Sequence, residues 1–194
     1  MMHVSRRAVI INAGIGTGVA AVCSVIGTPL LAQGAGNWPS SRRSLGPEGG
    51  PNGVPYADGY PGRGNKIRRV SINHGTIIDG FQCFWETGSP GDHHGGSGGS
   101  PYDFDIDRGD YLTTIEGSVG PHNSWPTVVK SLKFHTKSGG SSPLYGAPRG
   151  AQEHGFLLKA PKGWQILGFF GRSGTVVDAI GVFCMPIPAR RPTA

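Results

Sequence analysis

Glycine and proline interrupt this chain so often that it cannot fold as a bundle of long helices. The sequence holds 34 glycines and 16 prolines in 194 residues. After residue 34, the longest run that lacks both is Thr127–Ser138, which is twelve residues long. Glycine and proline are the least favourable residues in a helix interior, whereas short runs between turns suit strands. We therefore expect an all-β fold and exclude helical bundles and doubly wound nucleotide-binding folds.

The remaining composition indicates a folded core rather than a disordered chain. Only 15% of the residues are charged, against roughly 25% in an ordinary domain. Aromatic and β-branched residues are interleaved along the chain and can be buried together. Short apolar runs between turn residues predict eight strands, at Arg68–Asn73, Ile77–Trp85, Tyr102–Asp107, Tyr111–Ser118, Val128–Thr136, Phe156–Lys159, Gln165–Phe170 and Val176–Met185.

Residues 1–34 differ from the rest of the chain. Arg6 and Arg7 are their only charged residues, and the apolar stretch Ala8–Leu31 that follows leads to small residues at Ala32–Gly36. This order is typical of an export signal that is cleaved, and Ser5–Ile10 resembles the twin-arginine export signal of bacteria. We expect a secreted or periplasmic protein. The alternative is a retained membrane anchor, which the glycines of this stretch disfavour.

The domain organisation follows from this division. We assign residues 1–34 to the export signal, residues 35–45 to a polar linker, residues 46–187 to the folded domain and residues 188–194 to a loose tail. Loss of the signal lowers the formal net charge from +6 to +4. The remaining basic residues are scattered, so neither a nucleic-acid partner nor a membrane surface is expected for the mature chain.

Cysteines and acidic residues give no reason to expect a metal or another cofactor. Cys83 and Cys184 remain after loss of the signal, and in an exported chain they form either one disulfide or two buried thiols. Asp103, Asp105 and Asp107 alternate as in a calcium loop, but the glycine and glutamate that such a loop needs further on are absent. We interpret these carboxylates as the outer face of a strand.

A weak internal repeat indicates the architecture. The pattern Gly-x-x-x-Asp/Thr-x-apolar recurs at Gly75–Phe81, Gly109–Ile115 and Gly174–Ile180, and pairs of adjacent glycines recur as well. Three copies of a short strand unit suggest a pseudo-threefold β architecture. The middle copy carries Thr113 where the others carry Asp79 and Asp178, so two carboxylate sites are expected rather than three.

A turn of the Gly-x-x-x-Asp type has the groups that a sugar site needs. A carboxylate accepts hydrogen bonds from two neighbouring sugar hydroxyls, and consecutive backbone N–H groups in a tight turn donate to sugar oxygens. Glycine lets the backbone approach the ligand closely. For a single isolated copy, the alternative is a tight hairpin whose aspartate hydrogen-bonds its own turn.

Several segments together carry a family resemblance: Gly46–Gly50, Ile77–Cys83, Ser131–Thr136 followed by Tyr145–Gly146, and the closing block Gly168–Val182. These segments resemble the jacalin-related lectins, and the resemblance spans about Leu45–Ile187. It implies a β-prism I fold, in which three four-stranded Greek-key sheets are related by pseudo-threefold symmetry. It also implies a carbohydrate-binding protein that has no catalytic activity and needs no metal.

For a first candidate site, the resemblance implies roles for five residues. Asp178 would accept hydrogen bonds from the 4- and 6-hydroxyls of a hexose. Thr175 and Val176, after the turn residue Gly174, would donate backbone N–H groups, and Gly50 would contact the 3- or 4-hydroxyl. Because Thr175 and Val176 are not aromatic and the chain runs uncut past Gly50, the implied ligand is mannose or glucose rather than galactose.

For a second candidate site, the resemblance implies Asp79 as the carboxylate and Thr76 and Ile77 as backbone donors. Gly75 begins this turn, and Gly99 would face it from a glycine-rich loop. The expected partners are mannose- or glucose-containing glycans, and a homo-oligomer is compatible with the sequence. The alternative is a protein-interaction module of the same fold without sugar binding. No pair of base and nucleophile points to an enzyme.

Overall fold

Three long β-hairpins form the centre of the fold, which a computed structural model describes for residues 38–188. The hairpin strands are rich in β-branched and aromatic residues, which pack well on a pleated surface. Residues 38–188 contain β1 (Arg43–Gly49), β2 (Val54–Ala57), β3 (Ile67–His74), β4 (Ile78–Trp85), β5 (His94–Gly95), β6 (Ser100–Asp105), β7 (Leu112–His122), β8 (Trp125–Thr136), β9 (Tyr145–Gly146), β10 (His154–Lys159), β11 (Trp164–Ser173) and β12 (Val177–Pro186).

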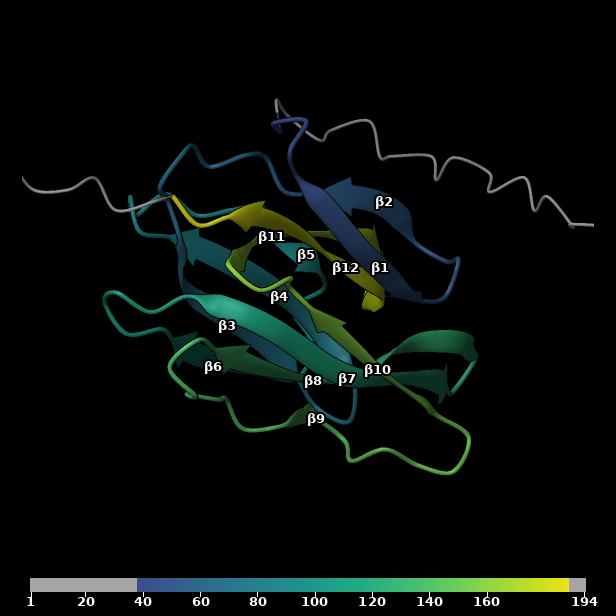
Figure 1. Cartoon of the computed structure of the whole chain (residues 1–194). Coiled ribbons are helices and arrows are strands. Elements are labelled where there is room, and N and C mark those ends of the chain that lie inside the picture. The colour runs from purple at the N-terminus through teal and green to yellow at the C-terminus, as the bar shows by residue number, and fades with distance from the viewer. Residues whose placement is uncertain (1–37, 189–194) are drawn as a thin grey trace, which may run out of the picture. The chain divides into compact units, whose positions relative to one another are not determined.

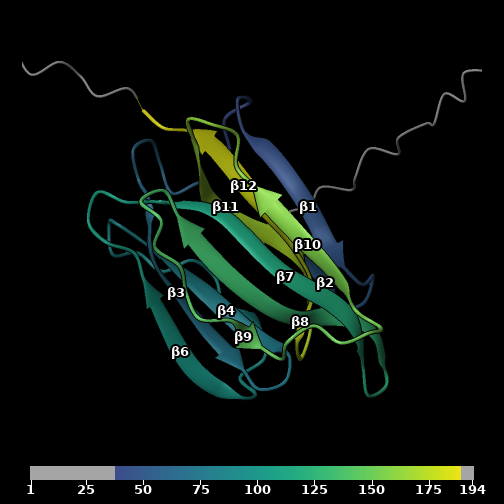
Figure 2. The same cartoon turned by 60° about the horizontal axis from the view of Figure 1, so that its bottom comes forward.

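The strands form three four-stranded antiparallel sheets of the same design (Figures 1 and 2). Their orders are β1-β12-β11-β2 in sheet A, β5-β4-β3-β6 in sheet B and β10-β7-β8-β9 in sheet C. In each sheet, one hairpin occupies the centre and two shorter strands flank it. Sheet A takes its hairpin from the end of the chain and its outer strands from the beginning. The threefold repetition of this Greek-key order confirms the predicted β-prism.

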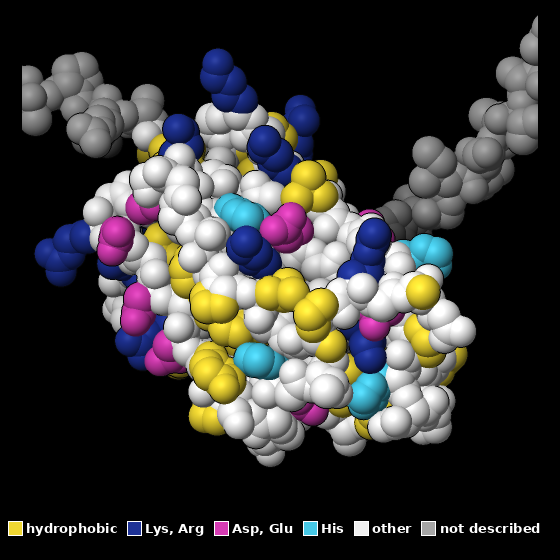
Figure 3. Space-filling model, turned by 90° about the horizontal axis from the view of Figure 1, so that it is seen from below, with side chains coloured by type: hydrophobic (Ala, Val, Ile, Leu, Met, Phe, Trp, Pro, Cys, Tyr) yellow, Lys and Arg dark blue, Asp and Glu magenta, His cyan; other side chains and the backbone are white. Residues whose placement is uncertain are grey.

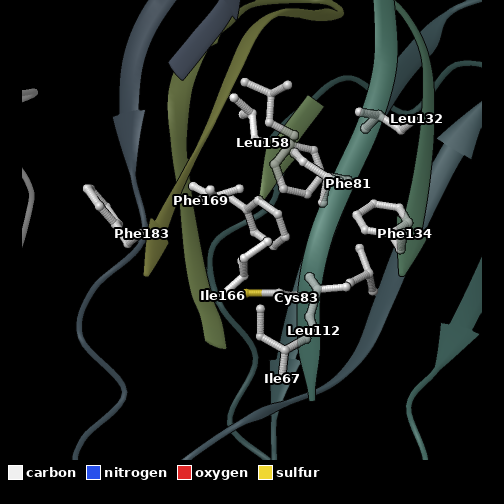
Figure 4. Close-up of a cluster of buried hydrophobic side chains, with 14 of the residues drawn as sticks. Ile67, Phe81, Cys83, Leu112, Leu132, Phe134, Leu158, Ile166, Phe169 and Phe183 are labelled. Carbon is white, nitrogen blue, oxygen red and sulfur yellow. The ribbon is translucent and has the colours of Figure 1, made fainter. Parts of the chain in front are cut away.

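One face of every sheet contributes to a shared apolar core (Figure 4). Phe81 of β4, Phe134 of β8 and Phe169 of β11 supply one fully buried ring from each sheet. Phe81 and Phe169 meet edge to face, with ring centroids 5.2 Å apart. Burial of each such ring contributes roughly 1.5–3 kcal/mol, so the core holds the three sheets together.

A buried carboxylate links sheets A and B. Asp58, just after β2, is completely buried. Its Oδ2 accepts the backbone N–H of Phe169 at 2.8 Å, and its Oδ1 accepts the Nε2–H of His94 at 2.7 Å. The thiol of Cys83 lies 3.5 Å from Oδ2, and the indole N–H of Trp38 donates to the Asp58 carbonyl at 2.8 Å. Segments far apart in sequence therefore meet at one residue.

A second apolar cluster, here called the cap cluster, closes one end of the domain. Ile77 and Val176 lie in the hairpin turns of sheets B and A, Val128 lies near the start of β8 in sheet C, and the three side chains are buried together. They take the same place in three copies of one short motif: Thr76-Ile77-Ile78-Asp79, Thr127-Val128-Val129-Lys130 and Thr175-Val176-Val177-Asp178. The pseudo-threefold symmetry is thus visible in the packing of the turns.

The middle copy of the repeat does not lie where the sequence predicts it. Gly109–Ile115 enters β7 at the far end of the hairpin, where Leu112 pairs with Thr136. The equivalent of the other two turns is Thr127–Lys130, which follows Pro126 instead of a glycine. The prediction that Gly109–Ile115 is the middle copy is therefore wrong.

The eight predicted strands are all present, with ends that differ by a few residues. The structure adds β1, β2, β5 and β9, all of which lie at sheet edges. These strands are very short or contain glycine and proline, so alternation of apolar and polar residues does not mark them. Their hydrogen bonds to a neighbouring strand, a tertiary feature, define them.

The folded domain begins earlier than the sequence predicts. β1 starts at Arg43, inside the predicted linker of residues 35–45. Trp38 is buried against Phe183, with ring centroids 4.7 Å apart, and the Arg42 guanidinium lies over the same ring. The predicted signal at residues 1–34 and the tail beyond residue 188 lie outside the described residues. In the part of the chain that is described, no helix is long and apolar enough to cross a membrane.

The two cysteines of the domain are free thiols. Cys83 and Cys184 are both buried and unbonded to each other, which decides between the two alternatives. Burial raises the pKa of Cys184 to about 12. Burial, reinforced by the nearby Asp58 carboxylate, also raises the pKa of Cys83. Both thiols therefore stay protonated and unreactive at neutral pH.

Removal of the Asp58 carboxylate is expected to destabilise the fold strongly. In Asp58→Ala, the His94 imidazole and the Phe169 N–H would remain buried without their acceptor, which costs about 3–5 kcal/mol. Asp58→Asn keeps one oxygen acceptor and should cost less. Denaturant unfolding followed by tryptophan fluorescence gives both free energies of unfolding. An Asp58→Ala protein as stable as the wild type would contradict this account.

Candidate functional site

The turn between β11 and β12 has a geometry suited to ligand binding. The N–H of Gly174 donates to the carbonyl of Val176 at 3.0 Å, which closes the turn. The Val176 side chain is buried in the cap cluster, while Gly174 and Thr175 are exposed. Within residues 38–188, no acceptor takes the N–H groups of Thr175 and Val176. Two backbone donors are thus held in place and free.

The carboxylate of Asp178 lies beside these donors. Asp178 is the second residue of β12, and its side chain accepts no hydrogen bond from any described residue. Gly53 faces it so closely that a Cβ at this position would overlap Asp178 Oδ2. Arg172 holds the Gly53 loop, because its Nε donates to the Asn52 carbonyl at 2.8 Å and its Nη2 to the Gly53 carbonyl at 2.7 Å.

Two opposing effects act on this carboxylate. Burial raises the pKa of Asp178, and the positive charge of Arg172 offsets part of this rise. Only 3% of the Asp178 surface is exposed. No described residue donates a hydrogen bond to its carboxylate, so a ligand that supplies hydroxyl donors would be favoured here.

Gly50, which the sequence analysis expects to contact a sugar hydroxyl, is not exposed beside the Asp178 carboxylate. Its N–H donates to the backbone carbonyl of Asp178 at 2.8 Å, and a Cβ on Gly50 would collide with the carbonyl of Thr127. Gly50 is therefore buried between sheets A and C, and Gly53 takes the position beside the Asp178 carboxylate. A sequence pattern does indicate Gly53: a glycine follows the Gly-Gly pair by three residues here, and the same spacing recurs at Gly99.

The turn between β3 and β4 repeats this arrangement. The N–H of Gly75 donates to the carbonyl of Ile77 at 3.2 Å, and Gly75 and Thr76 are exposed. Gly98 lies against the Asp79 carboxylate, with 2.6 Å between its ideal Cβ position and Asp79 Oδ1. Neither the N–H groups of Thr76 and Ile77 nor the Asp79 carboxylate has a partner among residues 38–188.

The glycine loops of the two turns are equivalent. Gly96 donates to the Asp79 carbonyl at 2.8 Å, as Gly50 does to the carbonyl of Asp178. Gly53 and Gly99 share a left-handed backbone, with φ angles of 67° and 68°, which side chains rarely adopt. The structure thus brings together the predicted residues of the second site, and all those of the first except Gly50. Below, site 1 denotes the Asp178 turn with Gly53, and site 2 the Asp79 turn with Gly98 and Gly99.

The equivalent segment of sheet C, Thr127–Lys130 at the start of β8, offers no third site of this kind. Lys130 stands in the position of the site aspartates, where the sequence analysis placed Thr113. Its ammonium donates to His122 Nδ1 at 3.2 Å and lies 3.8 Å from Glu153 Oε1. A ligand hydroxyl would meet a donor there instead of an acceptor.

The described residues contain no group of three or more His, Cys, Asp or Glu side chains placed to hold a metal ion. The alternating carboxylates lie on the outer face of sheet B as predicted, where Arg69 pairs with Asp103 at 3.0 Å and with Asp105 at 2.7 Å. On the face that Figure 3 shows, basic side chains alternate with acidic and apolar ones. That face therefore has no continuous basic stripe.

Replacement of the Asp178 carboxylate should leave the fold intact and slightly more stable at neutral pH. Because burial raises its folded-state pKa, ionisation of Asp178 opposes folding above that pKa and has no effect below the unfolded value. Asp178→Asn removes this penalty, so its free energy of unfolding at neutral pH should rise by up to about 0.5 kcal/mol. At acid pH the difference should vanish. Urea unfolding at both pH values measures it, and a marked loss of stability would contradict the assignment.

Comparison with known proteins adds independent information. The family profile described as Jacalin-like lectin domain matches residues 45–183. Horcolin from Hordeum vulgare subsp. vulgare is 35% identical over 150 residues, which are 73% of this chain and 96% of that protein. Jacalin-related lectin 3 from Arabidopsis thaliana is 34% identical over 152 residues, 75% of this chain but only 24% of that protein.

A solved structure agrees with the fold as well. The crystal structure of an artocarpin–mannotriose complex shares 29% identity and a TM-score of 0.65, over 76% of this chain and 99% of that chain. The family profile covers most of the chain, horcolin is similar to it in sequence over nearly its whole length, and artocarpin has the same fold. The chain therefore belongs to the family of jacalin-like lectin domains.

Proposed function

We propose that this protein binds mannose- or glucose-type glycans through sites 1 and 2. One observation carries the proposal: in both turns, an aspartate carboxylate and two backbone N–H groups have no hydrogen-bond partner among residues 38–188, and a glycine lies directly against the carboxylate. A hexopyranose supplies the missing partners, since its neighbouring hydroxyls both donate and accept. The mannotriose bound to artocarpin, a relative of the same fold, supports this sugar class.

Each site should bind weakly by itself. Both are shallow turns, and a monosaccharide gains a few hydrogen bonds of about 0.5–1.5 kcal/mol each, or up to ~3 kcal/mol for those to a carboxylate. This corresponds to a dissociation constant on the order of 0.1–10 mM per site. Simultaneous engagement of two sites in one chain can strengthen binding to a dense glycan surface by about 10²–10⁴-fold. We propose no catalytic role and no cofactor.

We also propose that residues 1–34 direct export, because Arg6 and Arg7 precede an apolar stretch with small residues at its end. The protein recovered outside the cytoplasm of a bacterial host should begin near Ala32–Gly36 by N-terminal sequencing. Replacement of both arginines by lysine should retain it in the cytoplasm. Export of that double variant at the wild-type level would rule out a twin-arginine signal.

Gly53→Ala is expected to abolish binding at site 1. The new methyl group would overlap the Asp178 carboxylate in a backbone conformation that alanine adopts at a cost of about 1 kcal/mol. Gly109→Ala is the matched control, because Gly109 has a φ of 92° but no atom near its ideal Cβ position. Calorimetry with methyl α-mannoside should show one site fewer for Gly53→Ala and an unchanged number for Gly109→Ala. Two intact sites in Gly53→Ala would refute the geometry of site 1.

The two aspartates should act as independent acceptors. Asp178→Asn and Asp79→Asn each remove charge-assisted hydrogen bonds worth about 1.5–3 kcal/mol apiece, so each variant should bind one mannoside per chain where the wild type binds two. The double variant should bind none. Asp105→Asn, on the outer face of sheet B, is the control and should bind two. If the wild type binds no sugar, the protein-interaction alternative is favoured.

A further inference from the structure

We propose that site 2 continues into an aromatic shelf, formed by Tyr102 and His74, which binds the second sugar residue of a glycan. The inference rests on the proposed function, because the shelf extends the site of the first sugar. It implies that site 2 binds a disaccharide more tightly than a monosaccharide, whereas site 1 does not. The two sites would then differ in the length of glycan that they recognise.

The shelf is an exposed and ordered group of rings. Tyr102 of β6 has 50% of its surface exposed. Its ring centroid lies 4.7 Å from that of His74, which in turn packs edge-on against Tyr145 at 5.3 Å. The backbone N–H of Gly146 donates to His74 Nδ1 at 3.0 Å and holds the imidazole in place. None of the residues in 38–188 hydrogen-bonds the Tyr102 hydroxyl, which leaves it free for a ligand.

The shelf is continuous with site 2. His74 directly precedes Gly75, the first residue of the turn, and its carbonyl oxygen lies 2.5 Å from the ideal Cβ position of Gly99. Three residues beyond Gly99, along the same edge strand, the chain reaches Tyr102. The two residues that carry the rings therefore adjoin the turn and its glycine loop, on the β6 side of sheet B.

Site 1 contains the same local sequence but no shelf. Gly53-Val54-Pro55-Tyr56 leads into β2 as Gly99-Ser100-Pro101-Tyr102 leads into β6. Tyr56, however, is buried: its hydroxyl donates to the Ala179 carbonyl at 3.2 Å, and its ring stacks on His94 with centroids 3.9 Å apart. Ser173 stands in the place of His74. Site 1 thus lacks both rings.

The residue across the strand decides which tyrosine is exposed. Tyr56 pairs with Gly171, and a Cβ on Gly171 would lie 3.0 Å from the Tyr56 hydroxyl, so the absent side chain gives this tyrosine room. Tyr102 pairs with Ile72, whose fully buried side chain fills the equivalent space. Tyr102 therefore remains on the surface, beside the sugar turn.

An exposed aromatic ring next to a polar turn suits an oligosaccharide. One face of a pyranose presents mainly C–H groups, and these can cover an aromatic ring while the hydroxyls at the edge stay hydrogen-bonded. If a second sugar covers roughly 40 Å² of ring surface, the affinity should rise about fivefold. The tyrosine hydroxyl adds one polar contact but is not required for stacking.

The test isolates site 2 in the Asp178→Asn background. Calorimetry with methyl α-mannoside and with an α-linked mannose disaccharide should give a disaccharide preference of about fivefold. Tyr102→Ala should remove this preference and leave the monosaccharide affinity unchanged, whereas Tyr102→Phe should retain it. In the Asp79→Asn background, which isolates site 1, the preference should be absent and Tyr102→Ala should have no effect.

These measurements separate the shelf from the proposed function. Unchanged monosaccharide binding would show that Tyr102→Ala is folded and that site 2 is intact. A purely structural role for the ring would not alter the ratio of the disaccharide affinity to the monosaccharide affinity. If site 2 binds the monosaccharide but shows no preference that depends on Tyr102, the shelf is refuted and the lectin function stands. If wild-type protein binds neither sugar, the proposed function fails and the shelf fails with it.

Discussion

The contacts of Asp58 are the constraint on which the arrangement of both sites depends. Its carboxylate takes hydrogen bonds from His94 and from the backbone of Phe169, so it joins β5 of sheet B to β11 of sheet A. His94 leads directly into the glycine loop of site 2, and Asp58 itself ends the segment that starts at Gly53 of site 1. A buried carboxylate that lost its partners would cost several kcal/mol. Both glycine loops are therefore connected to the same buried carboxylate.

The sites are products of packing between sheets rather than of isolated hairpins. Gly50, in the loop of site 1, packs against the Thr127 carbonyl of sheet C, and Gly96, in the loop of site 2, packs against the Thr175 carbonyl of site 1. Only glycine fits at either contact. The cap cluster fixes the same turns from the inside. Donors and acceptors are consequently in place before a ligand arrives, which reduces the entropy lost on binding.

Much of the fold and part of the candidate site could be predicted from the sequence. Alternation identified the strands of the three hairpins, because each has one face in the core, and the Gly-x-x-x-Asp pattern located both aspartates. The edge strands β1, β2, β5 and β9 were missed, since they are very short or contain glycine and proline, and the third copy of the repeat was missed because Pro126 replaces the leading glycine. Gly53 was not predicted as a site residue, because the pair of adjacent glycines favoured Gly50, whose role is packing.

The sequence by itself determined the all-β class and the two turns with their carboxylates, but it placed the third copy of the repeat at Thr113 instead of Lys130. Only the tertiary structure decided which glycine faces each carboxylate, because this depends on the loop of one sheet meeting the turn of another. It also decided that Tyr56 is buried and Tyr102 exposed, although both follow the same Gly-x-Pro pattern. One ring is buried over Gly171 and the other is kept outside by Ile72. A local pattern cannot express this difference, since the deciding residue lies on the neighbouring strand.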